Sequence, residues 1–210
     1  MTLLPRPSGA NQRRITQAMR LVLAAMVGYG LLTGNPKAVM NGSVALVITF
    51  VPAVLERNYD LSLDPWLALW LTTAVLLHSL GSSGLYSHIE WWDHVTHALS
   101  ASLIAGVGYT TVRAIDLHHR DIIIPREVAF VYIFVVVLSF GVVWELLEFA
   151  IGVTAGALGM PSVLTQYGVY DTLWDIIYNS IGGLLVALWG GVYLTDLSTA
   201  LSQRFAERRS

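Results

Sequence analysis

The stretch Trp91-Trp92-Asp93-His94-Val95-Thr96-His97 opens a long apolar segment and places ionisable groups inside it. An ionisable side chain is costly in hydrocarbon, so within a membrane-spanning segment it indicates a functional site. Asp93 and His97 are four residues apart, and on a helix they project from one face, about one turn from each other. The stretch therefore predicts a transmembrane helix with a polar stripe at its start.

Two later apolar segments carry polar groups at helical spacing. Glu145 and Glu148 are three residues apart in one segment, and Asp171, Asp175 and Asn179 follow at steps of four in the next. The two glutamates lie too far inside their segment to serve as helix caps. Three helices that each offer a polar stripe predict one shared site.

The composition is that of an integral membrane protein. Of the 210 residues, 55% are hydrophobic and only 12% are charged, which is too apolar for an average soluble domain. The net charge is −2 and basic residues are sparse, which argues against nucleic acid as a partner. There is no cysteine, so disulfides, thiolate nucleophiles and cysteine zinc sites are excluded.

Hydropathy predicts an all-α polytopic membrane protein with six transmembrane helices in one bundle. Residues 1–20 and 195–210 are the predicted cytoplasmic tails, and 21–194 form the six-helix transmembrane domain. Asp64-Pro65 marks a helix start, and Pro52 a kink. The predicted helices run near 21–33, 38–55, 65–80, 92–112, 127–151 and 172–194.

The distribution of basic residues predicts the orientation, because Lys and Arg are retained in cytoplasmic loops. With six spans, Lys37 alone falls on the outer side, and all arginines fall on the inner side. Both termini are therefore expected in the cytoplasm of a multi-pass cell-membrane protein, where His118 and His119 are solvated. The arginines are Arg6, Arg13, Arg14, Arg20, Arg57, Arg113, Arg120, Arg126, Arg204, Arg208 and Arg209.

This orientation predicts that the polar site lies roughly 5 to 12 Å beneath the non-cytoplasmic surface, from the rise of a helix per residue. His78 and His88 are expected at the same end, with their roles left open. The connector 152–170 has no charged residue and four glycines. It is either a lid over the site or a re-entrant segment that plugs the bundle.

Carboxylates and imidazole from several helices are suitable ligands for Zn, Mn, Fe or Mg. We predict a divalent metal ion held by Asp93, His97, Glu145 and Asp175. Glu148 is the expected general base or a further ligand, and His97 takes part in catalysis as well. Substrate contacts are expected from Asp171, Asn179 and His94.

Simpler explanations exist for several of these residues. Asp93 and Asp171 could be helix N-caps, and Asn179 could be a hydrogen-bonding link between helices. His94 points about 100° away from Asp93 and could face only the membrane interface. The whole set could also be a network that shares protons without metal.

The pattern Asp93-x-x-x-His97, then Glu145 and Glu148, then Asp171 to Asp175 with Asn179, resembles the YjdF family of small inner-membrane proteins. More remotely it is similar to VanZ-like membrane proteins. The resemblance covers the last three predicted helices and implies their fold and the position of the site. Glu148 departs from the Gln typical of VanZ-like proteins, and their arginine before the last Asp is missing. The resemblance implies no particular reaction.

These features predict a membrane-embedded, metal-dependent enzyme that acts as a hydrolase. Its expected partner is a membrane lipid or an amphipathic, lipid-linked small molecule at the non-cytoplasmic face. Buried carboxylates and histidines also form ion and proton paths, so an ion- or proton-coupled transporter is the alternative. A non-catalytic membrane scaffold, in which the polar cluster fixes helix register, is the third hypothesis.

Overall fold

The computed structural model describes residues 8–61, 63–118, 123–164 and 166–207. Within these ranges the chain forms helices and connectors and no strand, as the sequence predicts. Arg6, His119, Arg120, Arg208 and Arg209, which enter the prediction of orientation, lie outside them. The helices group into two compact units, Met1–His88 and Ile89–Ser210. The single six-helix bundle stays a prediction.

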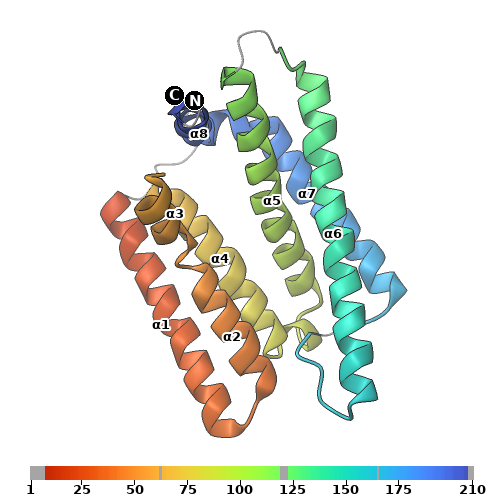
Figure 1. Ribbon diagram of the computed structural model, residues 1–210. Coiled ribbons are helices and arrows are strands. Elements are labelled where there is room, and N and C mark those ends of the chain that lie inside the picture. The colour runs from red at the N-terminus through yellow and green to blue at the C-terminus, as the bar shows by residue number, and fades with distance from the viewer. Residues whose placement is uncertain (1–7, 62, 119–122, 165, 208–210) are drawn as a thin grey trace. The chain divides into compact units, whose positions relative to one another are not determined.

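The first unit contains four α-helices, of which α1, α2 and α4 pack against one another (Figure 1). Leu23, Ala45 and Leu76, one from each of these helices, form its buried core. Helix α1 begins nine residues into the chain, so the second half of the predicted 1–20 tail is helical. The helices are α1 (Gly9–Thr33), α2 (Pro36–Ile48), α3 (Val51–Tyr59) and α4 (Pro65–Ser82), followed by the short 3-10 helix η1 (Leu85–Ser87).

The predicted second span is interrupted between α2 and α3. The interruption lies at Thr49 and Phe50, just before the proline at which a kink is expected. The Arg20 guanidinium of α1 donates hydrogen bonds to the Thr49 carbonyl, at 2.5 Å, and to its hydroxyl, at 3.1 Å. It also lies 4.6 Å from the centre of the Phe50 ring. A basic side chain therefore binds the backbone where the helix is broken.

Local signals set the limits of α4 as predicted. The Asp64 carboxylate accepts a hydrogen bond from the Trp66 backbone N–H at 2.8 Å, and Pro65 is the first helical residue. Gly84, with a φ of 143°, follows the end of the helix. This backbone conformation is open to glycine and costly for other residues.

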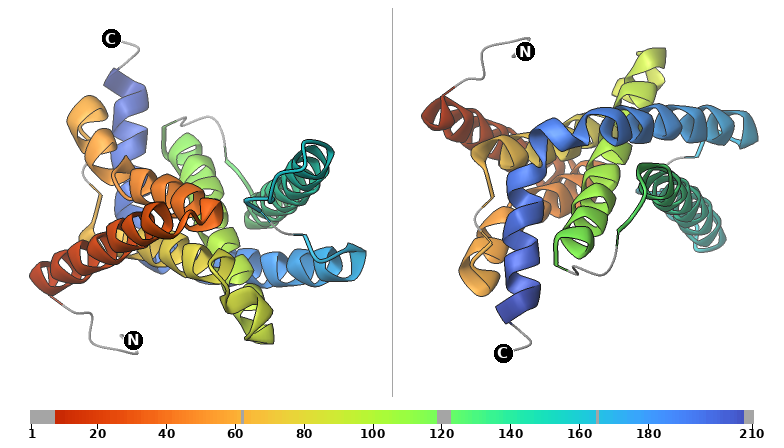
Figure 2. Two further views of the ribbon diagram at one scale, coloured as in Figure 1. Left: turned by 90° about the horizontal axis from the view of Figure 1, so that it is seen from below. Right: turned by 90° about the horizontal axis from the view of Figure 1, so that it is seen from above.

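The second unit contains the helices on which the predicted site residues lie. Helix α5 packs against α6, α7 and α8, and α6 packs against α7 (Figures 1 and 2). Figure 2 shows α8 leaving the end of α7 at a sharp angle. The helices are α5 (Glu90–His118), α6 (Arg126–Ala157), α7 (Val169–Tyr193) and α8 (Thr195–Glu207).

Helix α6 continues six residues beyond the predicted end at Ile151. Gly152 and Gly156 take helical backbone conformations, so the helix ends only near Gly159, whose φ is 66°. The Met160 N–H then donates to the Ala155 carbonyl at 2.9 Å and closes the last turn. Much of the uncharged connector is therefore helical.

Glycines permit the close approach of the three helices around the site. A Cβ atom at Gly182 of α7 would collide with the Ala98 carbonyl oxygen of α5. A Cβ atom at Gly141 of α6 would lie 2.8 Å from the Asn179 amide nitrogen of α7. Small residues let helix backbones approach in membranes, and here they bring α5, α6 and α7 together.

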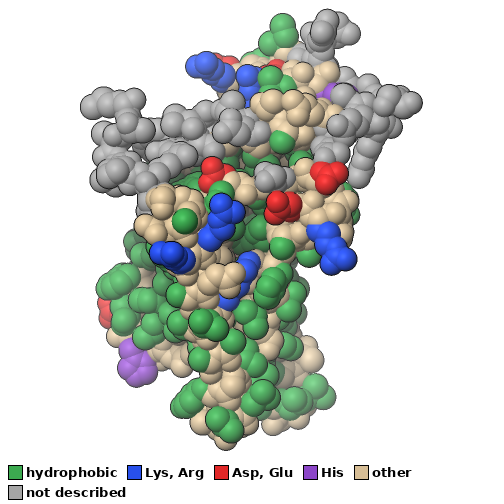
Figure 3. All heavy atoms as spheres, turned by 90° about the vertical axis from the view of Figure 1, so that its left-hand side faces the viewer, with side chains coloured by type: hydrophobic (Ala, Val, Ile, Leu, Met, Phe, Trp, Pro, Cys, Tyr) green, Lys and Arg blue, Asp and Glu red, His purple; other side chains and the backbone are tan. Residues whose placement is uncertain are grey.

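Within the part of the chain that the structure describes, four helical segments are long and apolar enough to cross a membrane: Gly9–Thr33, Pro36–Tyr59, Glu90–His118 and Arg126–Ala157. Helices α4 and α7 lie outside this set, so six spans and two cytoplasmic termini stay predictions. On the face shown in Figure 3, hydrophobic side chains are spread over the lower part, where a His side chain is also visible, and the visible Lys and Arg side chains lie above it. The protein is an all-helical membrane protein.

Candidate functional site

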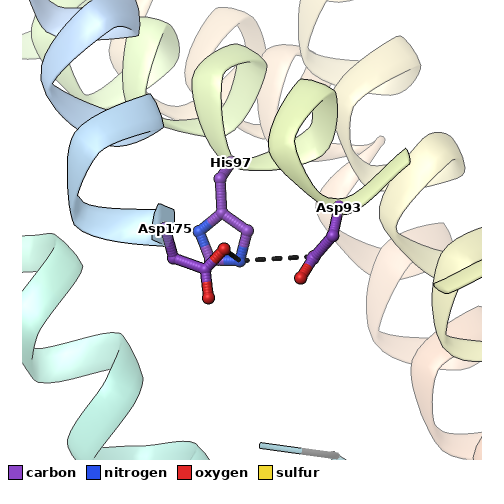
Figure 4. Close-up of side chains that lie close together, drawn as sticks. All are labelled: Asp93, His97 and Asp175. Atoms are coloured by element: carbon purple, nitrogen blue, oxygen red, sulfur yellow. Dashed lines mark ion pairs between the residues drawn. The ribbon is translucent and has the colours of Figure 1, made fainter. Parts of the chain in front are cut away.

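Asp93, His97 and Asp175 point toward one another from two helices (Figure 4). Nε2 of His97 lies 3.5 Å from Oδ1 of Asp93, one turn earlier on α5, and 3.7 Å from Oδ1 of Asp175 on α7. One ligand atom from each residue lies within 4.8 Å of the other two. Metal–ligand bonds are about 2 Å long, so ligand atoms about 3–4 Å apart are suited to sharing one ion.

Two carboxylate oxygens near this group are buried without a hydrogen-bond partner. Asp175 is 2% exposed and Glu145 is 4% exposed. Among the described residues, neither Oδ1 of Asp175 nor Oε1 of Glu145 has a hydrogen bond. A buried carboxylate oxygen that lacks such a bond is costly, unless it binds a proton or a cation. These two atoms are therefore the open positions of the cluster.

A chain of hydrogen bonds fixes which oxygen of Glu145 is open. The Gln166 side-chain N–H donates to the Thr172 hydroxyl oxygen at 3.2 Å, and the Thr172 hydroxyl donates to Oε2 of Glu145 at 2.8 Å. A hydroxyl has one proton, so Thr172 holds Oε2 of Glu145 as an acceptor. Oε1 of Glu145 is left to bind a proton or a cation.

Glu148, one turn further along α6, belongs to the same cluster. It is buried, and its Oε1 accepts a hydrogen bond from the Trp144 indole N–H at 3.0 Å. Its carboxylate lies close enough to Glu145 and Asp93 to interact electrostatically with both. The structure thus brings the two predicted glutamates of α6 to the acidic residues of α5.

Asn179 is buried one turn after Asp175 and hydrogen-bonds to the His97 side chain. A partner of this kind orients an imidazole ring and fixes the nitrogen that faces a ligand. Asn179 therefore links α7 to α5, as one interpretation of the sequence predicts. The link lies at the cluster itself. The predicted contact of Asn179 with substrate stays a prediction.

Asp171 and Asp93 both lie in the first turns of their helices, and neither is the residue before the helix. Oδ2 of Asp171 accepts a hydrogen bond from the Tyr167 backbone N–H at 3.3 Å and so holds the connector. Partial burial, with the charges of Asp93 and Asp171, raises the pKa of the Tyr167 hydroxyl. The end of the connector therefore lies beside the cluster.

His94 is turned away from the cluster toward aromatic residues of α7. Its ring stacks on Tyr178 at a centroid separation of 4.3 Å and an interplanar angle of 7°. Trp174 lies 6.0 Å from the same ring and 6.2 Å from Tyr178, and Tyr170 lies edge-on to Trp174. Three aromatic residues at steps of four thus run beside the acidic stripe of α7.

Sequence reasoning missed several of these contacts. Tyr170, Trp174 and Tyr178 recur at the same four-residue step as Asp171, Asp175 and Asn179, and that spacing was a usable signal. Nothing in the sequence marked Thr172 or Gln166, because hydroxyl and amide side chains are common at helix starts.

His78 and His88, expected near this end of the protein, lie in the first unit. The ring of His78 shares a hydrogen bond of 2.8 Å with the Tyr86 hydroxyl. His88 is exposed, and its Nδ1 lies 2.7 Å from the Gly84 carbonyl oxygen, within the turn after α4. Both therefore have local partners.

The cluster is strongly acidic. Among the described residues of this unit, the ion pairs of its carboxylates are those with His97. Arg113 pairs with Asp116 in the far half of α5, and Arg126 begins α6. Carboxylates buried this close together must share protons or bind a cation.

Comparison with known proteins gives a family that covers most of the chain. Residues 15–196 match the family described as predicted membrane protein (DUF2238). The chain belongs to the DUF2238 family. No curated protein and no solved structure matches it. The match extends over both units, so the polar cluster lies on three helices of the DUF2238 region.

Proposed function

We propose that the protein is a metal-dependent enzyme of the membrane, a hydrolase of lipids or lipid-linked molecules at the non-cytoplasmic face. The observation that carries the proposal is the buried group of Asp93, His97 and Asp175, whose ligand atoms lie within 4.8 Å of one another. The buried oxygens of Asp175 and Glu145 that lack a hydrogen bond support it, since a divalent cation would satisfy both.

In this proposal Asp93, His97 and Asp175 would hold the ion, and Glu145 would be a further ligand. The ion is Zn, Mn, Fe or Mg, and it would polarise a phosphoryl or carbonyl oxygen. The water oxygen adds to the phosphorus or to the carbonyl carbon, and the bond from that atom to the leaving ester oxygen breaks. Glu148 takes the proton from the water and passes it to the leaving oxygen. His97 also orients the reacting group, and Asn179 holds its ring.

We further propose that, within its family, this chain is related to the YjdF-like proteins and more remotely to the VanZ-like proteins. The support is the order of Asp93, His97, Glu145 and Asp175, together with the convergence of these residues. The membrane placement proposed here has six spans and both termini in the cytoplasm, and it puts the cluster near the outer surface.

The test measures metal in the purified full-length protein, after dialysis in detergent and again after chelation and reloading with each candidate ion. We expect about one divalent ion per chain in the wild type, and a loss of most of it in Asp175→Asn and His97→Ala. Asp116→Asn is the control, because that carboxylate pairs with Arg113 outside the cluster. A wild type that holds no stoichiometric metal, or an Asp175→Asn variant that keeps it, would overturn the proposal.

A second measurement separates metal binding from hydrolysis. Glu148→Gln should keep the ion but release little fatty acid or phosphate from lipid vesicles, a loss of about 100-fold or more if Glu148 is the general base. Reconstituted protein that moves a cation or a proton across the vesicle, and hydrolyses nothing, would favour the transporter. Intact cellular function with lowered stability in the double variant Asp93→Asn, Glu145→Gln would favour the scaffold.

A further inference from the structure

A row of aromatic side chains, Tyr178, Trp174 and Tyr170, follows α7 back to its first turn. It is continued by Tyr167 in the connector before α7, beside the acidic cluster. Tyr170 is 75% exposed and Trp174 is 39% exposed, whereas Tyr178 is covered by the stacked ring of His94. Tyr167 of the connector is 53% exposed. Tyr167, Tyr170 and Trp174 therefore keep part of their surface exposed, although Trp174 also contacts His94, Tyr170 and Tyr178.

Asp171 lies among these aromatic residues. It follows Tyr170 directly and precedes Trp174 by about one turn. The backbone N–H of Tyr167 donates to its carboxylate at 3.3 Å, and the Tyr167 hydroxyl interacts with its charge. Asp171 is only half-buried, unlike Asp175 one turn further on. We call Tyr167, Tyr170, Asp171 and Trp174 the aromatic mouth.

The charge of the aromatic mouth indicates the kind of group that it fits. A carboxylate next to exposed aromatic side chains attracts an ammonium group, through charge pairing and through the negative faces of the rings. Aromatic cages of this type recognise quaternary ammonium ligands. The described arginine side chains of this unit, Arg113 and Arg126, lie at the other ends of their helices. The aromatic mouth therefore suits a cationic group and not an anionic one.

Apolar surface adjoins the aromatic mouth. Leu173 and Ile177 follow Tyr170 on α7 at steps of three and four residues and are exposed. Such side chains on a membrane protein face the acyl chains of lipids. A lipid whose ammonium head group binds at the aromatic mouth would place its acyl chains along this surface.

We propose that the aromatic mouth binds the ammonium head group of a choline or ethanolamine lipid. This inference rests on the proposed function, because it names the class of lipid that the proposed hydrolase would bind at the same site. Asp171 pairs with the ammonium group, and the rings of Tyr170 and Trp174 contact its methyl or methylene groups. The ester bonds of the bound lipid are then held beside the buried cluster.

The experiment measures lipid retention by the full-length protein, using native mass spectrometry from a maltoside detergent. The probes are short-chain phosphatidylcholine and phosphatidylglycerol with identical acyl chains. We expect the choline lipid to bind about tenfold more tightly in the wild type, and this preference to disappear in Asp171→Asn and Trp174→Leu. The Asn side chain keeps an acceptor for the Tyr167 N–H, and Leu keeps apolar volume, so both variants are expected to fold.

Trp91→Ala is the matched control, because Trp91 is an exposed aromatic residue near the start of α5 that contacts Trp92. It should keep the preference. Equal binding of the two lipids by the wild type, or a preference that survives in Asp171→Asn, would overturn the proposal. Competition by free choline as strong as by the choline lipid would overturn the assignment to a lipid.

The same titration is repeated on metal-free protein, because the aromatic mouth does not depend on the ion. Head-group preference without hydrolysis or bound metal would support this inference and defeat the proposed function. Metal binding and hydrolysis without head-group preference would support the proposed function and overturn this inference.

Discussion

At the scale of single residues, the Thr172 side chain sets the orientation of the Glu145 carboxylate. Its hydroxyl proton occupies Oε2 of Glu145 because Gln166 donates to the hydroxyl oxygen. Thr172→Val keeps the shape of the side chain and removes that proton, so Glu145 can turn. We expect the affinity for the divalent ion to fall about 10-fold or more, as for other residues that orient ligands.

The measurement is a metal-binding isotherm of purified protein in detergent. Thr172→Ser is the control, since it keeps the hydroxyl and should bind the ion nearly as well as the wild type. Equal affinities of Thr172→Val and the wild type would show that this hydroxyl does not orient Glu145.

The predicted ligands could be found from the sequence because charged residues are rare in apolar segments and recur at helical steps. Asp93, His97 and Asp175 meet as that spacing predicts. Glu145 interacts electrostatically with Asp93 and His97 and its Oε1 has no hydrogen bond among the described residues, but it is not one of the three residues whose ligand atoms meet, and its role as a ligand stays a prediction. Contacts such as that of Thr172 with Glu145 join different helices and depend on their rotation about their axes, which spacing alone does not determine.

At the scale of the helices, the contact of Gly182 with Ala98 sets how closely α7 approaches α5. A methyl group at position 182 would collide with the Ala98 carbonyl oxygen. We expect Gly182→Ala to lower the free energy of unfolding by about 1–3 kcal/mol, the usual cost of overpacking. The measurement is thermal unfolding in detergent, followed by circular dichroism.

Gly152→Ala is the matched control in α6, because nothing lies within 4 Å of a Cβ atom there. It should be neutral or stabilise by up to about 1 kcal/mol, as expected for Gly→Ala in a helix. If Gly182→Ala unfolded at the same temperature as the wild type, the contact between α5 and α7 would be looser than described.

Helix ends were predictable where a local signal marks them, as at Asp64 and Pro65. They were less predictable where glycines occur inside a helix. Gly152 and Gly156 were interpreted as part of a connector, yet they continue α6 because flanking hydrogen bonds outweigh the modest preference of glycine for other conformations.

At the scale of the whole molecule, the number of spans is the open prediction, and the absence of cysteine makes it testable. Six spans place Met160 outside the cell and Ile123 in the cytoplasm. If α4 and α7 did not cross the membrane, the four remaining spans would exchange the two positions. Both side chains are exposed, at 61% and 86%.

Single cysteines at these positions should therefore react differently with a membrane-impermeant maleimide in intact cells. We expect labelling of Met160→Cys and protection of Ile123→Cys until the membrane is permeabilised. Gln203→Cys, near the carboxyl terminus, is the internal control and should stay protected until permeabilisation under either count. Labelling of Ile123→Cys alone would show that four spans are present.

The all-helical membrane class was predictable because it follows from composition and hydropathy. The division into two compact units was not, because hydropathy shows which segments enter the bilayer and carries no information on which of them pack together.

The bond between Arg20 and the interrupted backbone at Thr49 has a consequence for biogenesis. An arginine that enters a bilayer by itself costs several kcal/mol, and a free carbonyl at a helix break carries its own penalty. The hydrogen bond between the two groups offsets both costs. It can form only when α1 and the segment Pro36–Tyr59 are side by side. The first two hydrophobic segments should therefore leave the translocon together as a hairpin. The first segment would stay at the translocon until the second has been synthesised.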